Sequence, residues 1–346
     1  MTGHDRPGTG SDRPAVRVAV LGTADIARRR MLPAFAACPD TTVAVVAGRD
    51  PERTAALARS YGCRAAATYD EPLADDTVDA VYVPLPNSLH HRWARAALLA
   101  GKHVLVEKPA ATSAADAEEL VALARDRGLA LVENVLFPHH PQHREAVRLV
   151  TDGAIGRVQS LEAAFTVPRR AEGDIRHRPE LGGGALWDVG VYPVRAALHL
   201  AAVLMPPGAP PGPPGASPLR LVGATSRRRP GEAVDTAGSA LLDAGEGVAV
   251  QLTYGLDHAY RSSYTLHGTT GRLTVEPAFT PPADHRPLLR LERDGTVHDH
   301  PAAAADQVAR AVAAFAQAVR TRAEPSGDLV TQARLLAAVA RAAAPA

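Results

Sequence analysis

The chain is poor in cysteine, with only Cys38 and Cys63 among its 346 residues. Two cysteines are too few for a disulfide framework or a zinc site. The sequence also contains no apolar run of the length that a membrane span requires. Its first fourteen residues lack the apolar segment of a signal peptide. We therefore expect a cytoplasmic protein that does not engage a membrane.

An excess of charge of either sign is also missing. Lysine and arginine together number 38 and aspartate and glutamate 37, so the formal net charge is +1. A nucleic-acid-coating surface or an acidic tail would need a strong imbalance, and we expect no nucleic-acid partner. Hydrophobic residues make up 46% of the chain and charged residues 22%. This composition is typical of a globular protein, and the length favours two domains.

The first third of the sequence alternates between short apolar strands and helices. Helix-start signals stand at Asp50-Pro51 and at Ser113, and Gly101 and Gly128 follow the ends of two helices. Short apolar strands separated by helices predict a parallel sheet covered on both faces. The predicted strands are Val16–Leu21, Val43–Ala47, Asp79–Pro84, His103–Val106 and Leu129–Glu133, and the predicted helices are Asp25–Ala37, Asp50–Ser60, Leu89–Ala100 and Ser113–Arg127.

After about Phe137 the pattern changes to longer alternating strands with few helices between them. This order predicts a mostly antiparallel open sheet in a domain of α+β type. The predicted strands are Val158–Val167, Leu219–Arg229, Gly247–Tyr254, Ser262–His267 and Arg272–Val275, and the predicted helices are Gln142–Thr151, Ala303–Arg322 and Leu329–Ala344.

We predict an α/β protein with three segments. Residues 1–14 form a disordered terminus, residues 15–136 a Rossmann domain that binds a dinucleotide, and residues 137–346 an α+β domain for substrate binding and oligomerisation. The C-terminal helices are expected to pack back on the first domain. The Pro- and Gly-rich stretch Pro206–Pro218 is predicted to be a surface insertion without function.

The turn after the first strand reads Gly-Thr-Ala-Asp-Ile-Ala, from Gly22 to Ala27. The dinucleotide fingerprint has a glycine where Ala24 stands. Gly22 permits the tight turn, Ala24 is small enough for a pyrophosphate to approach, and Ala27 lets the helix pack closely. The amides of the helix N-terminus then face the phosphates. We predict that this turn holds a dinucleotide, the alternative being a plain strand-to-helix connection.

The end of the second strand, Ala47-Gly48-Arg49, indicates which dinucleotide binds. NAD-binding domains usually place Asp or Glu here to hold the ribose 2′-hydroxyl. That carboxylate is missing, and the guanidinium of Arg49 can pair with a 2′-phosphate. The carboxylate of Asp50 would favour NAD instead, but its role as a helix cap accounts for this residue. We therefore predict NADP(H) as the cofactor.

Three further motifs carry a resemblance to a known family. The E-K-P element, followed about eighty residues later by D-x-G-x-Y, resembles the Gfo/Idh/MocA family, which is named after glucose–fructose oxidoreductase and inositol dehydrogenase. The resemblance extends from about Val16 to the C-terminal helices. It implies a Rossmann domain followed by an α+β domain with an open sheet. The motifs are PNSLH (Pro86–His90), AGKHVLVEKP (Ala100–Pro109) and GGGALWDVGVYP (Gly182–Pro193).

Other stretches are similar to a narrower group, the NADPH-dependent sugar 3-ketoreductases of deoxysugar biosynthesis. The similarity implies reduction of the C-3 keto group of a dTDP-linked 3,4-diketo 2,6-dideoxyhexose. Tyr192 ends the D-x-G-x-Y motif where the inositol dehydrogenase branch has histidine, which favours carbonyl chemistry over polyol oxidation. The similar stretches are ADIARRRMLPA (Ala24–Ala34), ENVLFPHHPQH (Glu133–His143), DIR (Asp174–Arg176) and GTTGRLTVEPAFTPP (Gly268–Pro282).

The resemblance assigns the chemistry to Lys108, Asp188 and Tyr192. Reduction of a ketone needs a hydride from the nicotinamide and a proton for the developing alkoxide. Lys108 would polarise the carbonyl and lower the pKa of Tyr192, and either of the two would deliver the proton. Asp188 lies one turn before Tyr192 on the same helix face and would hold Lys108 or a cofactor hydroxyl. The resemblance also implies a cis bond between Lys108 and Pro109.

The remaining site residues follow from their position or from the resemblance. Two stay open: His90 belongs to the cofactor border or to a helix core, and Arg176 contacts a phosphate or lies in a solvated loop. The expected cofactor contacts are Gly22, Thr23, Ala24, Asp25, Ile26, Ala27, Gly48, Arg49, Tyr69, Leu85, Asn87, His90, Glu107, Lys108, Arg176 and Asp188, and the expected substrate contacts are Lys108, Tyr192, Tyr260 and Thr280.

The histidines His139, His140 and His143 invite a metal-site interpretation. No carboxylate or cysteine partner has the spacing of a metal site, so we expect no metal here.

Two other functions remain as alternatives. One is an NADP-dependent oxidoreductase of free sugars, of the glucose–fructose oxidoreductase or xylose dehydrogenase type, or of aromatic dihydrodiols. The other is a non-catalytic NADP-binding regulator, which would have no need of Lys108, Asp188 and Tyr192. By analogy with the family we expect a homodimer or homotetramer formed through the open sheet. The alternating apolar residues of Val158–Val167 and Gly247–Tyr254 fit such an interface.

Overall fold

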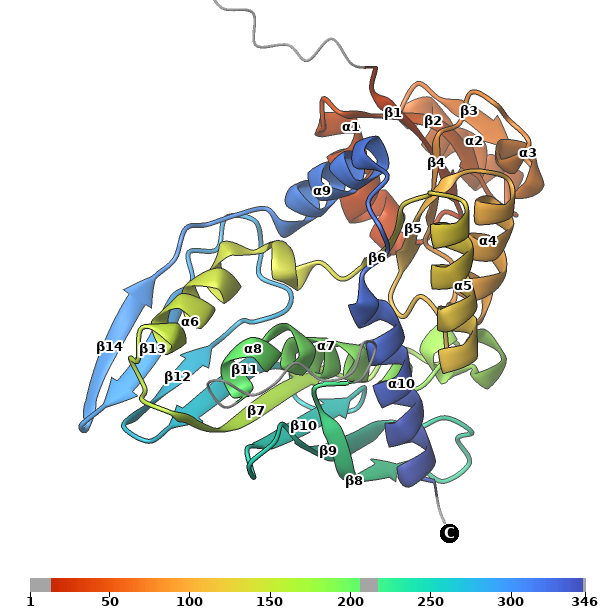
Figure 1. Cartoon of the computed structure of the whole chain (residues 1–346). Coiled ribbons are helices and arrows are strands. Elements are labelled where there is room, and N and C mark those ends of the chain that lie inside the picture. The colour runs from red at the N-terminus through yellow and green to blue at the C-terminus, as the bar shows by residue number, and fades with distance from the viewer. Residues whose placement is uncertain (1–13, 206–216, 345–346) are drawn as a thin grey trace, which may run out of the picture.

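Two β-sheets, one of six strands and one of eight, organise the chain (Figure 1). The computed structural model describes residues 14–205 and 217–344. The predicted disordered terminus, apart from Pro14, and most of the predicted insertion at Pro206–Pro218 therefore lie outside the described residues. The sheets occupy opposite sides of the molecule, and the C-terminal helices α9 (Gln307–Thr321) and α10 (Gly327–Ala342) lie between them (Figure 1).

The first sheet is parallel, in the order β3-β2-β1-β4-β5-β6. The predicted strands are all present, and the predicted α/β fold is confirmed. The short strand β3 was not predicted, because Arg64 and Ala65 are exposed and no apolar run marks it. The strands are β1 (Val16–Leu21), β2 (Thr41–Ala47), β3 (Arg64–Ala66), β4 (Ala80–Val83), β5 (His103–Glu107) and β6 (Leu131–Asn134).

Helices connect these strands, and their ends follow the predicted signals. The Asp50 side chain accepts a hydrogen bond from the Arg53 amide at 3.1 Å, and Ser113 accepts one from Asp116. Both are caps that satisfy free amides of a first helical turn. The helices are α2 (Pro51–Ser60), α3 (Asp70–Leu73), α4 (Asn87–Leu99) and α5 (Ala114–Asp126).

The first helix differs from the expected regular form. It begins at Asp25, widens into a π-helical stretch, η1 (Ala27–Met31), and continues as α1 (Leu32–Ala37). Pro33 stands near the start of α1 and has no backbone N–H to donate. Such a missing donor is a common cause of local change in helical hydrogen bonding. The π-helical stretch therefore accommodates Pro33. The apolar periodicity of the sequence does not reveal this change of helix type.

The second sheet is mixed, in the order β14-β13-β12-β11-β7-β10-β9-β8. Only β7 and β10 pair in parallel, so the predicted mostly antiparallel sheet is confirmed for the described residues. Sequence reasoning missed β9, β13 and β14. Strand β9 begins with small residues, and five of the six residues of β14 are exposed. The strands are β7 (Val158–Thr166), β8 (Arg220–Arg227), β9 (Ala237–Asp243), β10 (Ala249–Gly255), β11 (Arg261–Gly268), β12 (Gly271–Val275), β13 (Leu288–Arg293) and β14 (Thr296–Pro301).

Helices cover one face of this sheet and join it to the first. Leu186 and Val194, just before and within α7, share a core with Tyr254 of β10. Gly190 permits the close approach, because a Cβ at this position would lie 3.2 Å from the Tyr254 ring. The helical segments are η2 (Phe137–His139), α6 (Pro141–Thr151), η3 (Ile175–His177), η4 (Pro179–Leu181), η5 (Leu186–Gly190), α7 (Val191–His199) and α8 (Ala201–Leu204).

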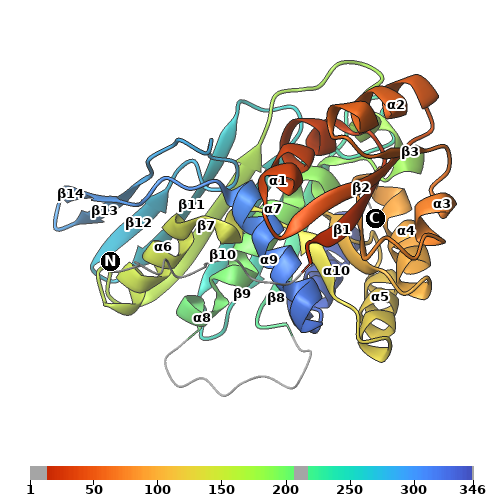
Figure 2. The ribbon, with the colours of Figure 1, turned by 90° about the horizontal axis from the view of Figure 1, so that it is seen from above.

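The two C-terminal helices belong to different cores. Val312 and Phe315 of α9 pack with Val18 and Phe35 of the first sheet's side, and α9 lies beside α1 (Figure 2). The residues of α10 divide between the cores of both sheets. We propose that the chain divides into domains near residue 136, with α9 returning to the first domain.

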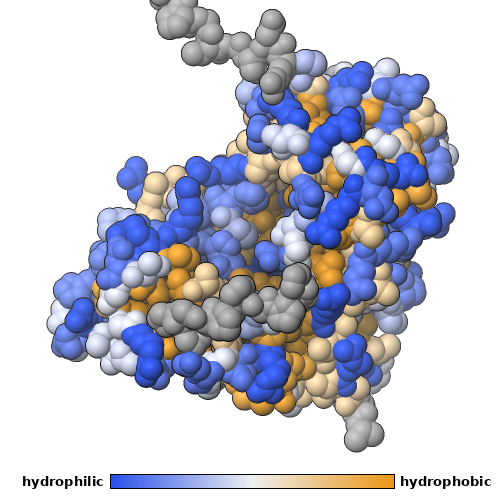
Figure 3. All heavy atoms as spheres, in the orientation of Figure 1, coloured by the Kyte–Doolittle hydropathy of each residue, from blue (hydrophilic) through white to orange (hydrophobic). Residues whose placement is uncertain are grey.

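No helix within the described ranges is both long and apolar enough to cross a membrane. On the face shown in Figure 3, hydrophilic residues cover much of both lobes, and apolar residues form separate patches on each lobe.

Candidate active site

A cleft of about 680 Å³ lies at the carboxyl ends of the first sheet's strands and reaches the loops before α7. Ligand pockets commonly have volumes of about 300 to 1,000 Å³, and open parallel sheets bind ligands at this edge. Of the expected residues, those that line the cleft are Gly22, Thr23, Ala24, Asp25, Ile26, Arg49, Tyr69, Leu85, Asn87, His90, Glu107, Lys108, Arg176, Asp188 and Tyr192.

The glycine of the first turn is required by its backbone. Gly22 has a φ of 115°, and a Cβ there would lie 3.0 Å from a methyl carbon of Leu85. Ala24 follows it at the wall of the cleft, where a side chain larger than a methyl group would fill the approach to the turn. The turn therefore has the shape that a phosphate-binding connection needs.

Two residues expected to contact the cofactor lie outside the cleft instead. Ala27 is fully buried in the core beneath the turn. Gly48 is also buried, and a Cβ there would lie 2.3 Å from the Thr54 hydroxyl and 3.2 Å from a methyl group of Thr23. Gly48 is needed for packing between the turn and α2, and Ala27 belongs to the core, so neither residue lines the cleft, contrary to the expected direct contact.

Cationic side chains gather beside the end of β2. Arg49 is exposed at the cleft wall, next to Tyr69. Burial raises the pKa of Tyr69, and the neighbouring Arg49 acts in the opposite direction. Sequence reasoning missed Arg53, which also lines the cleft and donates a hydrogen bond to the Thr23 carbonyl at 2.6 Å. Its position in the first turn of α2, next to the strand end, is the signal that could have identified it.

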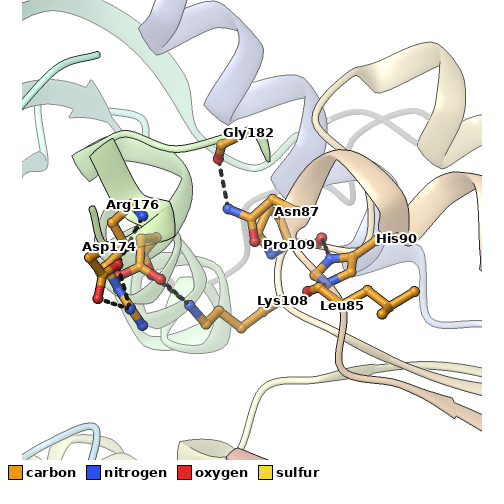
Figure 4. Close-up of polar contacts among 9 residues, drawn as sticks. Leu85, Asn87, His90, Lys108, Pro109, Asp174, Arg176 and Gly182 are labelled. Atoms are coloured by element: carbon orange, nitrogen blue, oxygen red, sulfur yellow. Dashed lines mark hydrogen bonds and ion pairs between the residues drawn. The ribbon is translucent and has the colours of Figure 1, made fainter. Parts of the chain in front are cut away.

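Lys108, the residue after β5, reaches across the cleft to the helix of the second sheet (Figure 4). Its Nζ donates to Asp188 Oδ1 at 3.0 Å and to the Asp188 backbone carbonyl at 2.8 Å. The same atom lies 5.3 Å from the centre of the Tyr192 ring. The bond between Lys108 and Pro109 is cis, as the resemblance implied. The structure thus brings together the three residues to which the sequence assigned the chemistry.

The charges in this cluster set its protonation. Burial by itself raises the pKa of Asp188, but Lys108 and Arg176 outweigh it and lower that pKa to about 2. Burial lowers the pKa of Lys108, whereas the charges of Asp188, Tyr192 and Glu107 leave it raised overall. At neutral pH the carboxylate is therefore ionised and the lysine is an ammonium ion.

Burial and the neighbouring Lys108 act in opposite directions on the pKa of the Tyr192 phenol. Burial raises its pKa, and the opposing effect of Lys108 is too weak to lower it below the ordinary value. Lys108 lowers the pKa of Tyr192, as expected, but removal from water outweighs this one nearby cation and leaves the pKa raised overall. In consequence Tyr192 carries its proton at neutral pH.

Arg176 is held by carboxylates. Its Nε donates to Asp188 Oδ2 at 2.6 Å, and its Nη1 donates to Asp174 at 3.2 Å (Figure 4). Asp188 therefore bridges Arg176 and Lys108, one oxygen to each. This arrangement favours a structural partner of Asp188 over the expected phosphate ligand.

Asn87 and His90 occupy different surroundings at the start of α4. The Asn87 amide donates to the Gly182 carbonyl at 2.9 Å, which ties the helix to the loop before α7 (Figure 4). His90 is buried, with ring nitrogens 2.7 Å from the Pro109 carbonyl oxygen and 2.6 Å from that of Leu85. His90 is thus buried in α4, lines the cleft and contacts the backbone that follows Lys108.

Glu107 accepts hydrogen bonds from two residues that sequence reasoning missed. Tyr82 donates to its Oε1 at 2.7 Å and Asn134 donates to the same atom at 2.6 Å. Asn134 also lines the cleft, and its Oδ1 is buried without a hydrogen-bond partner. Asn134 lies at the carboxyl end of β6 and in the stretch Glu133–His143 that carries part of the resemblance, and these were the signals that the sequence offered.

Tyr260 and Thr280 lie beyond the residues that line the cleft. Their hydroxyl groups are 3.0 Å apart, and Tyr260 is 55% exposed. Aromatic contacts lead from them to the site: the Phe165 ring centre lies 6.4 Å from that of Tyr260 and 4.7 Å from that of Tyr192. Tyr260 and Thr280 thus lie next to the aromatic cluster of Phe165 and Tyr192.

In the histidine cluster, His143 is a packed core residue. His143 is buried, with ring nitrogens 3.0 Å from the Tyr264 hydroxyl and 3.0 Å from the Ala278 carbonyl oxygen. Burial holds the pKa of His143 well below its usual value. Across the part of the chain that the structure describes, no group of three or more His, Cys, Asp or Glu residues is placed to hold a metal ion.

Half of the missed residues at the cleft come from the connection between β7 and α7. This connection contains short helical turns without an apolar pattern, so its path over the cleft could not be predicted from the sequence. The missed residues at the cleft are Asp50, Arg53, Pro84, Pro86, Asn134, Leu136, Gly173, Asp174, Ile175, Leu181, Gly182 and Gly183.

The site can be compared with known proteins. Residues 16–135 match the Gfo/Idh/MocA oxidoreductase family with an NAD-binding Rossmann fold, and residues 143–274 match the Gfo/Idh/MocA C-terminal domain. A dTDP-3,4-didehydro-2,6-dideoxy-alpha-D-glucose 3-reductase of Streptomyces violaceoruber is 49% identical over 91% of this chain and 88% of that protein. A protein of the same name from Actinomadura kijaniata is 44% identical over 94% of both chains.

A solved structure shares the fold over nearly the whole chain. It is a 3-ketoreductase from Actinomadura kijaniata in complex with NADP and TDP-benzene, with a TM-score of 0.89, 43% identity and coverage of 95% of this chain and 98% of that one. The family matches cover most of the sequence, and the relatives are similar throughout both sheets. The chain therefore belongs to the Gfo/Idh/MocA family of oxidoreductases.

Proposed function

We propose that the protein uses NADPH to reduce the C-3 keto group of a dTDP-linked 3,4-diketo 2,6-dideoxyhexose. The observation that carries this proposal is the cluster of Lys108, Asp188 and Tyr192 at one end of a cleft whose other end is the turn at Gly22. The identity of 49% to a 3-reductase that acts on such a sugar supports the choice of substrate.

The cleft fits NADP(H) on its own geometry. The turn after β1 lines the cleft from Gly22 to Ile26, and a Cβ at Gly22 would crowd Leu85, so this close packing requires glycine. A helix begins at Asp25, and the amides of a helix N-terminus are suited to bind phosphates. Arg49 and Arg53 stand where the 2′-phosphate of the adenosine ribose would lie, with no carboxylate ending β2. We propose that these groups hold the phosphates and that Asn87, Glu107 and Asn134 line the nicotinamide end.

The chain's own groups supply what the carbonyl needs. Bound NADPH supplies the hydride that forms the new C–H bond at C-3. The ammonium of Lys108 spends two of its N–H groups on Asp188, which leaves one to donate to the carbonyl oxygen. This hydrogen bond stabilises the negative charge that develops as the C=O π bond breaks.

We assign the proton to Tyr192. Its phenol is protonated at neutral pH because burial raises its pKa. Transfer of this proton to the alkoxide forms the new O–H bond and leaves a phenolate, which the nearby Lys108 ammonium stabilises. A proton from water then restores the phenol, so the cycle consumes one NADPH and one proton for each ketone reduced.

The second sheet carries the residues that we propose for substrate contact and for oligomerisation. We propose that the wall from Tyr192 through Phe165 to Tyr260 and Thr280 contacts the sugar nucleotide. The sheet also exposes Val222 and Leu241 on the neighbouring strands β8 and β9. We propose that this sheet forms a homodimer or homotetramer.

The substrate class is tested by a thermal-shift titration of the NADP-saturated protein with dTDP, UDP, glucose and xylose. A ligand that binds only the folded state adds about 2.7 kcal/mol of stability at a hundredfold excess over its dissociation constant. We expect a clear rise of the melting temperature with dTDP and none with the other three. A rise with a free sugar and none with dTDP would favour the free-sugar oxidoreductase.

Removal of the acid groups tests the mechanism. We expect Lys108→Ala and Tyr192→Phe each to lower kcat about a hundredfold or more, the range for lost acid catalysis, with NADPH affinity nearly unchanged. The measurements are steady-state NADPH oxidation and NADPH fluorescence titration. Tyr61→Phe, which alters a tyrosine packed in the first sheet's core, is the matched control. Wild-type turnover in either variant would remove that residue from the mechanism.

The cofactor preference is tested at Arg49. We expect Arg49→Ala to weaken NADPH about tenfold or more and to leave NADH nearly unchanged, because only NADPH carries the 2′-phosphate that a guanidinium would bind. Arg59→Ala, in the last turn of α2 and outside the cleft, controls for the loss of a surface charge. Equal losses for both cofactors would contradict the pairing of Arg49 with the phosphate.

A further inference from the structure

A buried carboxylate, Glu133, lies next to the residues of the cleft without lining it. The Glu133 side chain, on β6, is 4% exposed, and Glu133 is not among the residues that line the cleft. Burial of a charge without strong partners would be very unfavourable. The contacts of Glu133 therefore indicate what its position achieves.

Glu133 binds the backbone that follows Lys108. Its Oε1 accepts a hydrogen bond from the Ala110 amide at 2.8 Å. The carbonyl oxygen of the intervening residue, Pro109, lies 2.7 Å from a ring nitrogen of the buried His90. The backbone on the far side of the Lys108–Pro109 bond is thus fixed from two directions.

The partner of Glu133 comes from the helix that carries Tyr192. Arg195 lies three residues after Tyr192 in α7, and its Nη2 donates to Glu133 Oε2. Its Nε donates to the Gln332 side-chain oxygen at 2.7 Å, and Gln332 in turn donates to both oxygens of Glu133, at 2.8 and 3.0 Å. The half-exposed Asp328 lies 3.5 Å from Arg195 Nη1. The carboxylate is therefore bound by groups from α7 and α10.

These contacts close a ring through the active site. Lys108 holds Asp188 through Nζ, and Asp188 lies in the helical turn that runs into α7. Arg195 of α7 binds Glu133, and Glu133 binds the Ala110 amide two residues after Lys108. Lys108 is therefore tied at its ammonium and near its backbone to the same helix.

We propose that Glu133 and Arg195 are positioning residues that fix the distance between Lys108 and Tyr192. The proposal rests on the proposed function, which makes these two side chains the source of carbonyl polarisation and of the proton. Neither Glu133 nor Arg195 contacts the ligands of that reaction in this assignment. They act by setting the backbone of the Lys108 turn against α7.

Stability by itself does not account for this arrangement. A buried ion pair often contributes no more to folding than well-packed apolar residues of similar volume, because desolvation offsets the attraction. The guanidinium of Arg195 donates to the Glu133 carboxylate and to the Gln332 amide oxygen. Because a guanidinium is planar, two such hydrogen bonds fix its direction as well as its distance from its partners. Directional contacts are what an active site needs, since a shift of about 1 Å can lower a rate about a hundredfold.

The test removes both charges at once. The double variant Glu133→Gln with Arg195→Met keeps an acceptor for the Ala110 amide and leaves no lone buried charge. We expect its melting temperature to stay near that of the wild type, with kcat about tenfold to a hundredfold lower and KM within about threefold. The matched control is Asp40→Asn with Arg320→Met, which removes an ion pair (2.6 Å) between α9 and the first sheet's side, away from the cleft.

A spectroscopic signal reports the lysine directly. The chain contains only two lysines, Lys102 and Lys108. Lys102 lies just before β5, at the end opposite Lys108, and its Nζ donates to the backbone carbonyls of Asp75 and Val78. Lysine labelled with ¹³C at Cε therefore gives one active-site signal and one internal reference. We expect the double variant to shift the Lys108 signal of the NADPH-loaded protein and leave the Lys102 signal in place.

The outcomes separate this proposal from the proposed function. An unchanged Lys108 signal with wild-type kcat in the double variant would overturn the positioning role. If the wild type shows no 3-ketoreductase turnover, the proposed function fails, and the Lys108 signal alone still decides whether Glu133 and Arg195 fix the lysine. If the double variant does not fold, Gln332→Met gives the same test: a shifted Lys108 signal supports the ring, and an unshifted one refutes it.

Discussion

The ion pair between Lys108 and Asp188 is the contact on which the site depends. Lys108 follows a strand of the first sheet, and Asp188 lies in the helical turn that packs on the second sheet. Their side chains are each 14% exposed and meet at 3.0 Å. Each of these charges alone would be costly to bury. The two charges offset each other only when the two halves of the chain pack together and bring Lys108 to Asp188. The contact that builds the site therefore also joins the two halves of the chain.

The groups around this pair explain its use. Arg176 takes the second oxygen of Asp188, so the carboxylate is fully occupied and stays ionised. Lys108 in turn stays charged, and Tyr192 stays protonated because it is buried. The site thus holds a fixed cation beside a protonated phenol before a ligand arrives. Such preorganised groups stabilise charge that develops during a reaction without having to rearrange.

The sequence predicted the architecture where local patterns were strong. The caps at Asp50 and Ser113 and the apolar strands located the Rossmann sheet, and the motif resemblance identified Lys108, Asp188 and Tyr192. Strand β14 was missed because its exposed residues carry no periodic signal. The net direction of the Tyr192 pKa could not be predicted because burial, which the sequence does not reveal, outweighs the neighbouring cation. Contacts between distant segments, such as Glu133 with Gln332, required the folded chain.

The central claim is that hydride reaches C-3 of a dTDP-linked diketo sugar while Tyr192 and Lys108 serve its oxygen. The most direct measurement is reduction of dTDP-3,4-diketo-2,6-dideoxyglucose with NADPH deuterated at C4 of the nicotinamide, followed by mass and NMR analysis of the product. The account predicts one deuterium, bound to C-3, together with a new hydroxyl group at that carbon. Deuterium at C-4, or no transfer of deuterium to the sugar, would contradict it.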